Sequence, residues 1–213
     1  MKTKFITKTD QLTTAVVFLI EELTRSKPVQ LSTSHCNTYY IFTDGAFEPT
    51  SGTPGTIGGL LVDEWGRSLE FFGLEVPSPL LQQFLEFSDH PIYELELLPV
   101  LVAIKLWAKI LCRCHAVFYL DNNAAHSALV RADGATPAAA GMVNEFVKFE
   151  KLLHLLPWFG RVPSHSNPAD DASRLSFDVP WLKQANQKQV VLPSHLSQWG
   201  ICTGTPAASH RKT

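Results

Sequence analysis

The spacing of hydrophobic residues changes along the chain and separates helical segments from strands. Residues 11–25 place apolar side chains at steps of three and four, which predicts a helix, and a polar linker follows. Three short stretches rich in aromatic and β-branched residues come next, at 37–43, 56–64 and 68–76, and each is typical of a strand. Residues 65–67, Trp-Gly-Arg, are typical of a hairpin turn. We therefore expect three antiparallel strands.

The middle of the chain changes to helical spacing. Residues 77–111 are predicted to be helical in two parts, with one apolar face buried in the core. Pro99 interrupts that pattern, and because proline removes a backbone donor and disfavours helical geometry before it, we expect a kink or a fresh start there. The apolar face consists of Leu97, Leu101, Ile104, Ala108 and Leu111.

The second half alternates strands and helices. Residues 116–120 predict a fourth strand buried on both faces, because its apolar residues do not alternate with polar ones. Residues 124–131 predict a short helix, and Thr136-Pro137 supplies an N-cap and a first-turn proline for a long one. Residues 158–162 predict a fifth strand, and Asn167-Pro168 is expected to cap a last short helix.

This order predicts an α/β fold with a mixed five-stranded sheet, three antiparallel strands followed by two parallel ones, and helices on both faces. The 213 residues, 45% of them apolar, are enough for one sizeable core. We expect an N-terminal helix and linker at 1–35, the main domain at 36–178 and a C-terminal extension at 179–213. The last dozen residues, 202–213, have the composition of a disordered tail.

Composition excludes several classes of protein. No apolar run is long enough for a membrane span and the first residues lack a secretory signal, so we expect a soluble, intracellular protein without membrane partners. The four cysteines are too few and too irregularly spaced for a disulfide framework and are interpreted as reduced thiols. A net charge of −2 and a pI near 6.4 are not typical of a protein that holds nucleic acid by bulk charge. They do not exclude nucleic-acid binding, because Mg²⁺ bound among carboxylates would attract phosphate to the same place.

Acidic residues follow two of the predicted strands. Asp44 closes the first strand and Asp121 closes the fourth, so parallel neighbours would bring both carboxylates to one edge of the sheet, where ligands bind in open α/β sheets. Glu96, at the start of the apolar helix, and Asp170, in the last short helix, can reach the same place. Carboxylate oxygens suit Mg²⁺ or Mn²⁺ rather than softer metals.

Each acid also has an ordinary structural interpretation. Asp44 precedes Gly45, which is typical of a turn, and Asp121 can cap the following helix. Asp170 falls in the first turn of a helix, where the helix dipole favours acids. Glu96 can lie on a solvated helix face. None of these interpretations explains why the acids occur together.

Four motifs in order resemble the ribonuclease H family, and within it the domains attached to reverse transcriptases of retroelements. They are Phe-Thr-Asp-Gly-Ala at 42–46, the Glu-Leu helix at 96–104, Tyr-Leu-Asp-Asn at 119–122 and Asn-Pro-Ala-Asp-Asp-Ala-Ser-Arg at 167–174. The last is similar to the Ala-Asp-x-x-Ser-Arg ending of retroelement versions. The resemblance extends over residues 39–174, about two thirds of the chain.

The resemblance implies a ribonuclease H-like fold and an endonuclease that hydrolyses the RNA strand of RNA–DNA hybrids, leaving 3′-hydroxyl and 5′-phosphate ends. Two Mg²⁺ or Mn²⁺ ions would be held by Asp44, Glu96, Asp121 and Asp170, with Asp44 bridging both ions. In this alignment the catalytic glutamate is Glu96 and not Glu94. Asp171 is the alternative to Asp170.

Secondary roles follow from the same resemblance. His165 would assist proton transfer or product release, although its gap to the last aspartate is short and a loop histidine bonded to backbone is the competing interpretation. Gly45 is expected to lie in the substrate site, and Asn122 or Asn123 would bond a sugar 2′-hydroxyl, unless they cap a helix instead. Arg174 would contact phosphate or end a short helix in solvent.

Rival functions differ in the residues they need. A 3′–5′ exonuclease of related fold has an Asp-x-Glu pair on the first strand, whereas Asp44 is followed by Gly45 and Ala46. A Holliday-junction resolvase or transposase-like nuclease would use similar carboxylates, and a non-catalytic module that binds nucleic acid or protein would not need all four. The chain also lacks the basic protrusion of some cellular relatives. Retroelement versions lack it too and borrow affinity from the attached polymerase, so the resemblance implies a reverse transcriptase or polymerase domain as a partner and weak substrate binding by this chain alone.

Overall fold

The computed structural model of the protein describes residues 13, 16–17, 19–21, 23–24 and 36–200. The chain divides into two units, residues 1–35 and 36–213. In the first unit every described residue is helical, as the spacing of its apolar residues predicts. The predicted linker and the predicted disordered tail at 202–213 lie outside the described residues.

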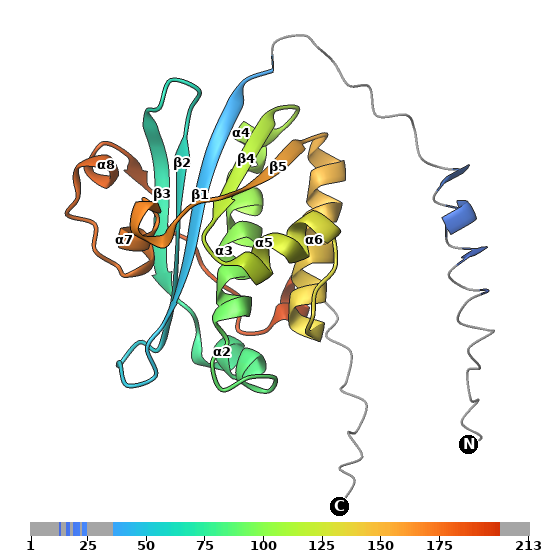
Figure 1. The fold of residues 1–213 in the computed structure, drawn as a ribbon, viewed down its shortest axis with the longest axis horizontal. Coiled ribbons are helices and arrows are strands. Elements are labelled where there is room, and N and C mark those ends of the chain that lie inside the picture. Colours follow the sequence, from blue (N-terminus) through green and yellow to red (C-terminus); the bar gives the residue numbers. More distant parts are fainter. Residues whose placement is uncertain (1–12, 14–15, 18, 22, 25–35, 201–213) are drawn as a thin grey trace, which may run out of the picture. The chain divides into compact units, whose positions relative to one another are not determined.

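The second unit is built on one mixed sheet with the strand order β5-β4-β1-β2-β3-β6 (Figure 1). β1 pairs antiparallel with β2, and β2 with β3, while β4 is parallel to β1 and β5 is parallel to β4. The predicted fold class and strand directions are confirmed, and β6 is a sixth strand that was not predicted. The strands are β1 Thr38–Phe47, β2 Gly55–Val62, β3 Ser68–Glu75, β4 His115–Leu120, β5 Leu156–Arg161 and β6 Asn186–Gln187.

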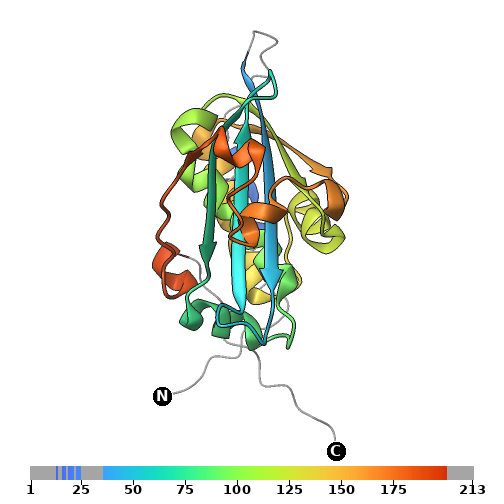
Figure 2. The same cartoon turned by 90° about the vertical axis from the view of Figure 1, so that its left-hand side faces the viewer.

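Helices cover both faces of the sheet, as predicted (Figures 1 and 2). One face carries α2 Ser78–Leu85, α3 Ile92–Leu106, α4 Ala108–Leu111, α5 Asn123–Arg131 and α6 Pro137–Leu153. The other carries α7 Asp170–Ser173 and α8 Pro180–Lys183, which Figure 2 shows in front of the strands. Two short 3₁₀ helices, η1 Ser164–Ser166 and η2 Leu196–Trp199, complete the described elements.

Each face of the sheet has its own hydrophobic core. Successive side chains of a strand point to opposite faces, so neighbouring residues of β2 and β3 divide between the two cores. Leu61 and Phe72 join the large core under α3 and α6, whereas Leu60 and Phe71 join a small core with Ala172 of α7. The small core holds α7 against β1 and β2, which is the contact that matters for the site.

The central helix α3 is surrounded on all sides, not on one face as predicted. Its residues from Glu94 to Ile104 are all buried. α3 also continues unbroken through Pro99, so the predicted fresh start is absent. Glu96 does not lie on a solvated helix face, since it is 3% exposed. Its neighbour Glu94 is 1% exposed, and its Oε1 accepts a hydrogen bond from Thr136 Oγ1 at 2.6 Å. α3 packs against the sheet and against α6, which explains its burial. The free energy gained by this packing offsets the loss of the backbone hydrogen bond that Pro99 removes.

Two strands also differ from expectation. β1 continues to Phe47, so Asp44 lies within the strand and not at its end. The Asp-Gly pair forms no turn, because Asp44 pairs with Gly58 and Gly45 with Ile57 across β2. β4 alternates between buried and half-buried residues and is not buried on both faces, since the small core covers only β1 to β3 closely.

Local signals of helix starts had mixed outcomes. Thr136 caps α6, its side chain accepting from Ala139 N at 3.2 Å, with Pro137 in the first position as predicted. Asn167 does not cap α7, since Ala169 occupies that position, and the Asn167 side chain binds elsewhere. Among the described residues no helix is long and apolar enough to cross a membrane.

Candidate active site

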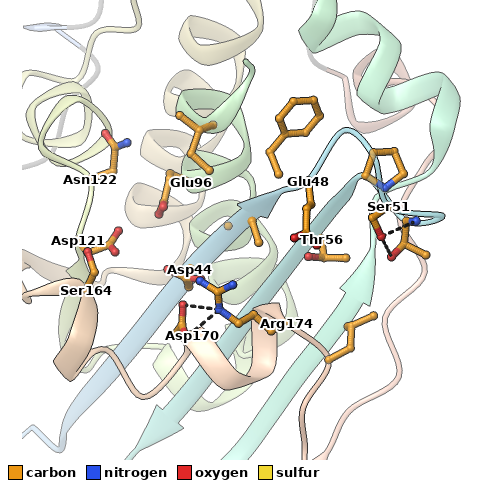
Figure 3. A pocket seen from close by; sticks show the side chains of 17 residues that line it. Asp44, Glu48, Ser51, Thr56, Glu96, Asp121, Asn122, Ser164, Asp170 and Arg174 are labelled. Atoms are coloured by element: carbon orange, nitrogen blue, oxygen red, sulfur yellow. Dashed lines mark hydrogen bonds and ion pairs between the residues drawn. The ribbon is translucent and has the colours of Figure 1, made fainter. Parts of the chain in front are cut away.

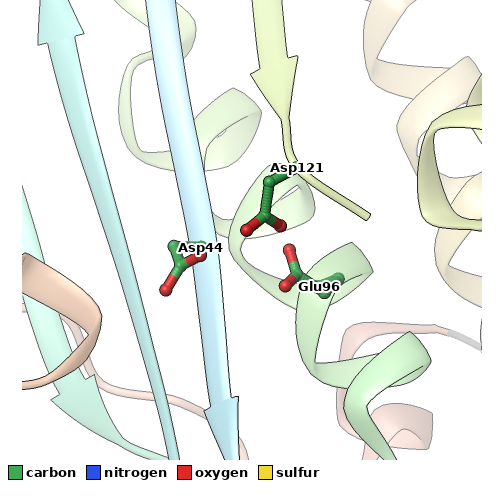
Figure 4. A group of neighbouring side chains, drawn as sticks. All are labelled: Asp44, Glu96 and Asp121. Atoms are coloured by element: carbon green, nitrogen blue, oxygen red, sulfur yellow. The ribbon is translucent and has the colours of Figure 1, made fainter. Parts of the chain in front are cut away.

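Three carboxylates from three different elements meet at one point of the sheet (Figure 4). Asp44 projects from within β1, Asp121 directly follows β4, and Glu96 lies near the start of α3. One carboxylate oxygen from each residue lies within 4.8 Å of those of the other two. Among the described residues this is the one group of His, Cys, Asp or Glu side chains arranged closely enough to hold a metal ion.

The fold explains how Asp44 and Glu96 come together. Gly45, next to Asp44, packs directly on the backbone of α3, and a Cβ atom at this position would overlap the carbonyl group of Leu95. Only glycine allows this contact without a shift of backbone. The contact fixes the first turns of α3 against β1, and Glu96 is the residue after Leu95. Gly45 therefore has a clear packing role, and its predicted substrate role stays a prediction.

A second close contact brings α7 to the opposite side of Asp44. Gly58, which pairs with Asp44 across β1 and β2, packs against the backbone of Ala172 and Ser173. A Cβ atom at Gly58 would overlap those backbone atoms. Asp44 is thus enclosed between α3 on one face of the sheet and α7 on the other, and it is 4% exposed.

Two side chains that were not predicted to belong to the site bind Asp44 directly. Asn167 Nδ2 donates to Asp44 Oδ1 at 3.3 Å and to the Thr43 carbonyl oxygen at 3.0 Å. Ser173 Oγ donates to Asp44 Oδ2. Both residues belong to the Asn-Pro-Ala-Asp-Asp-Ala-Ser-Arg motif, which was the available signal, but only its aspartates and arginine were assigned to the site, and Asn167 was expected to cap a helix.

Burial and mutual repulsion make negative charge costly in this cluster. The pKa of Asp44 is raised to about 7, first by burial and then by the charges of Asp121 and Asp170, against the Ser173 hydrogen bond and the Arg174 charge. The pKa of Glu96 is raised well above its usual value, first by burial and then by Asp44 and Asp121. Such perturbed acids are concentrated at functional sites.

The chemistry of the cluster fits a divalent cation. Glu96 Oε2 is buried and has no hydrogen-bond partner among the described residues, which is uncommon for a carboxylate oxygen. Hard oxygen ligands at this spacing suit Mg²⁺ or Mn²⁺, and the positive charge would offset the repulsion that raises the two pKa values.

Asp170 lies in the same pocket but is held differently (Figure 3). Its side chain is 38% exposed, and its two carboxylate oxygens accept from Arg174 Nε at 3.0 and 2.9 Å. It is outside the three-residue group around Asp44. The structure therefore brings Asp44, Glu96 and Asp121 together and places Asp170 beside them, paired with Arg174.

The pocket around these acids has a volume of about 670 Å³. Gly45, Asn122 and Arg174 line it, together with hydroxyl side chains from the loop between β1 and β2, from the start of β2 and from η1 (Figure 3). Those hydroxyl residues are Ser51, Thr53, Thr56 and Ser164. The lining thus combines acids, hydroxyl groups and one guanidinium group, which suits a polar ligand.

The remaining predicted residues lie outside the pocket lining. His165 is exposed on η1, Asn123 is exposed at the start of α5, and Asp171 is half-buried on α7.

Asn122 lines the pocket and also caps α5, its Oδ1 accepting from Ala124 N at 2.9 Å and from Ala125 N at 3.0 Å. Only its amide N–H groups remain to face a ligand.

Comparison by sequence finds no match to a known family and no match to a curated protein. Solved structures do match. The N-terminal RNase H domain of a Mycobacterium tuberculosis protein is 13% identical with a TM-score of 0.53, over 67% of this chain and 94% of that chain. LC11-RNase H1, isolated from compost by a metagenomic approach, is 18% identical with a TM-score of 0.50, over 67% and 96%.

LC11-RNase H1 in complex with an RNA/DNA hybrid also matches, at 17% identity and a TM-score of 0.50, over 66% of this chain and 96% of that chain. This chain matches almost the whole length of each of these solved structures, although the sequence identity is low. The predicted resemblance is confirmed at the level of architecture, and the chain has the ribonuclease H-like fold.

Proposed function

We propose that the protein is a divalent-metal-dependent endonuclease that hydrolyses the RNA strand of RNA–DNA hybrids and leaves 3′-hydroxyl and 5′-phosphate ends. The observation that carries the proposal is the cluster of Asp44, Glu96 and Asp121, with a buried, unpartnered oxygen on Glu96. Hydrolysis of a phosphodiester by bound metal needs no nucleophilic side chain, so three clustered carboxylates are enough for the chemistry.

The residues would divide between two metal ions. Asp44, Glu96 and Asp121 would hold one Mg²⁺ or Mn²⁺ ion, and Asp44 together with Asp170 would hold the second. Bound metal ions supply Lewis acidity that activates a water molecule and stabilises the departing 3′ oxygen. Both carboxylate oxygens of Asp170 accept hydrogen bonds from Arg174. To bind the second ion, Asp170 would therefore have to share its carboxylate between the ion and Arg174, or give up the ion pair with Arg174.

Other pocket residues would orient the nucleic acid. Arg174 lies beside the acids with a side chain that is 65% exposed, so its guanidinium group can bind a phosphate next to the cleaved one. The free amide N–H groups of Asn122 would donate to a sugar 2′-hydroxyl, the group that distinguishes RNA from DNA. The similarity to LC11-RNase H1, which binds an RNA/DNA hybrid, supports this choice of substrate.

A partner would supply much of the affinity for substrate. α6 is a single regular helix, and the short connection between α5 and α6 at 132–136 carries no lysine or arginine. With a net charge of −2, the chain has little general attraction for phosphate. We infer that a reverse transcriptase or polymerase domain holds the hybrid while this domain cuts it.

The test is a substrate panel of labelled RNA–DNA hybrid, duplex DNA and a four-way junction, with Mg²⁺ or Mn²⁺ or with chelator. We expect metal-dependent cleavage of the RNA strand only. Asp121→Asn should abolish it, and Asp133→Asn, an exposed control in the α5–α6 connection, should not. Cleavage of the junction or the DNA duplex instead would favour a resolvase or transposase-like nuclease, and no cleavage with no metal binding would favour a non-catalytic module.

A further inference from the structure

The segment that carries Asp170 also carries two buried polar side chains that bind Asp44. Asn167 is 5% exposed and Ser173 is 0% exposed, and they lie three residues before and after Asp170. Each donates to a different oxygen of the same carboxylate, Asn167 to Oδ1 and Ser173 to Oδ2. Neither residue has a part in the cleavage step proposed above.

The orientation of Asn167 is fixed from both ends of its amide. Its Nδ2 donates to Thr43 O at 3.0 Å and to Asp44 Oδ1 at 3.3 Å, while its Oδ1 accepts from Ala169 N at 3.2 Å. Turning the amide over would place N–H against N–H and oxygen against two acceptors. The hydrogen-bond network therefore assigns the donor side of Asn167 to Asp44.

The hydroxyl group of Ser173 has one proton and two acceptors within reach. These are Asp44 Oδ2 and the Asp170 carbonyl oxygen, the latter at 2.9 Å. A hydrogen bond to an ionised carboxylate is stronger than one to a neutral carbonyl, so the Ser173 hydroxyl group donates its hydrogen bond to ionised Asp44. The backbone of Ser173 packs closely against Gly58, which pairs with Asp44, so the fold keeps the Ser173 side chain next to Asp44.

These bonds leave part of Asp44 available to a metal. A carboxylate has about four lone-pair positions, and Asn167 and Ser173 occupy one on each oxygen. Because both oxygens are hydrogen-bonded, the carboxylate cannot rotate freely about its Cβ–Cγ bond. The remaining lone pairs therefore keep a fixed direction. Hydrogen-bonded partners of this kind orient metal ligands, and their loss typically weakens metal binding or activity by about 10–100-fold.

We propose that Asn167 and Ser173 are positioning residues that fix the Asp44 carboxylate for divalent-metal binding. This inference rests on the proposed function of the Asp44 cluster. Residues 167–173 would then have two roles, because the same segment places Asp170 in the pocket and orients the Asp44 carboxylate on β1.

The experiment compares Ser173→Ala and Asn167→Ala with Ser176→Ala, a control at an exposed serine just beyond α7. Mn²⁺ affinity is measured by calorimetry on the full chain, and hybrid cleavage is measured across a Mn²⁺ titration. We expect each of the two variants to bind Mn²⁺ about 10–100-fold more weakly. Their kcat should recover at high Mn²⁺, with KM for hybrid unchanged, while Ser176→Ala behaves as wild type.

Thermal unfolding in chelator separates positioning from folding. Ser173→Ala removes a single oxygen atom, so it carries the test should Asn167→Ala fail to fold. Lower thermal stability with unchanged Mn²⁺ affinity would show that the two side chains are only structural and would overturn the inference. A wild-type protein that binds no Mn²⁺ would instead overturn the proposed function itself.

Discussion

Asp44, Glu96 and Asp121 differ from Asp170 in how the fold holds them. The first three project from the central strands and the main helix, and the pKa values of Asp44 and Glu96 are raised by burial and by their neighbours' charges. Asp170 lies on a helix of four residues, partly exposed, with its charge balanced by Arg174. One pocket therefore contains three clustered acids whose charges repel one another and a fourth, partly exposed acid whose charge is balanced by Arg174.

If the protein binds two metal ions as proposed, this difference predicts the order in which they bind. A first cation can enter the Asp44 cluster without moving any ion pair, and it relieves repulsion among buried acids. A second cation would compete with Arg174 for Asp170. Because exposed ion pairs contribute only about 0–1 kcal/mol, that competition is weak enough to be overcome when substrate phosphate takes over Arg174.

The largest expected effect on stability is a pH dependence that comes from the buried group. The folded-state pKa of Asp44 is about 7, against 3.8 ordinarily, so between these values the folded chain binds more protons than the unfolded chain. Stability of the metal-free protein should therefore fall as pH rises from about 4 to about 7. One pKa unit is worth about 1.4 kcal/mol, so the loss is on the order of a few kcal/mol.

Denaturant unfolding in chelator, measured at several pH values, checks this expectation. Asp44→Asn should reduce the pH dependence of the unfolding free energy, and the part that remains should come from Glu96. Ser176→Ala should keep the pH dependence of the wild-type protein. An unchanged slope in Asp44→Asn would mean that Asp44 is not held as a buried, repelled acid, and the contrast between the two kinds of acid would fail.

A smaller effect is expected where the sheet contacts α3. Gly45→Ala places a Cβ atom against the Leu95 carbonyl group, so α3 has to move away from β1 and take Glu96 with it. Overpacking of this kind costs about 1–3 kcal/mol. Gly52→Ala, in the loop between β1 and β2, meets nothing within 4 Å and should be close to neutral.

Thermal and denaturant unfolding of the two glycine variants tests the contact, and Mn²⁺ affinity tests its consequence. Gly45→Ala should lose both stability and metal affinity. A stable Gly45→Ala variant with wild-type affinity would show that the close packing of β1 on α3 does not set the distance between Asp44 and Glu96.

Local patterns were enough to predict most of the fold. Strand and helix spacing, with caps such as Thr136, depends on residues close in sequence, and five strands were located in this way. β6 was missed because a two-residue strand has no alternation to detect. The extension of β1 through Asp44 and Gly45 was missed because pairing with β2 overrides the low strand propensity of both residues.

The candidate site was predictable only in part, for a similar reason. Asp44 and Asp121 could be located from the strands that carry them, and the motif resemblance selected Glu96 over its neighbour Glu94. Asn167 and Ser173 act on Asp44 from 123 and 129 residues away, and no periodicity reveals such partners. The Arg174 ion pair, which distinguishes Asp170 from the other acids, was missed although the two residues are only four apart.

Calorimetric titration of Mn²⁺ into the wild-type protein, Glu96→Gln and Asp170→Asn tests the central claim most directly. If the Asp44 cluster is the first metal site, the wild-type protein binds Mn²⁺, Glu96→Gln loses that binding, and Asp170→Asn retains it with little change. Equal binding by the wild-type protein and Glu96→Gln, or no binding by the wild-type protein, would contradict the account.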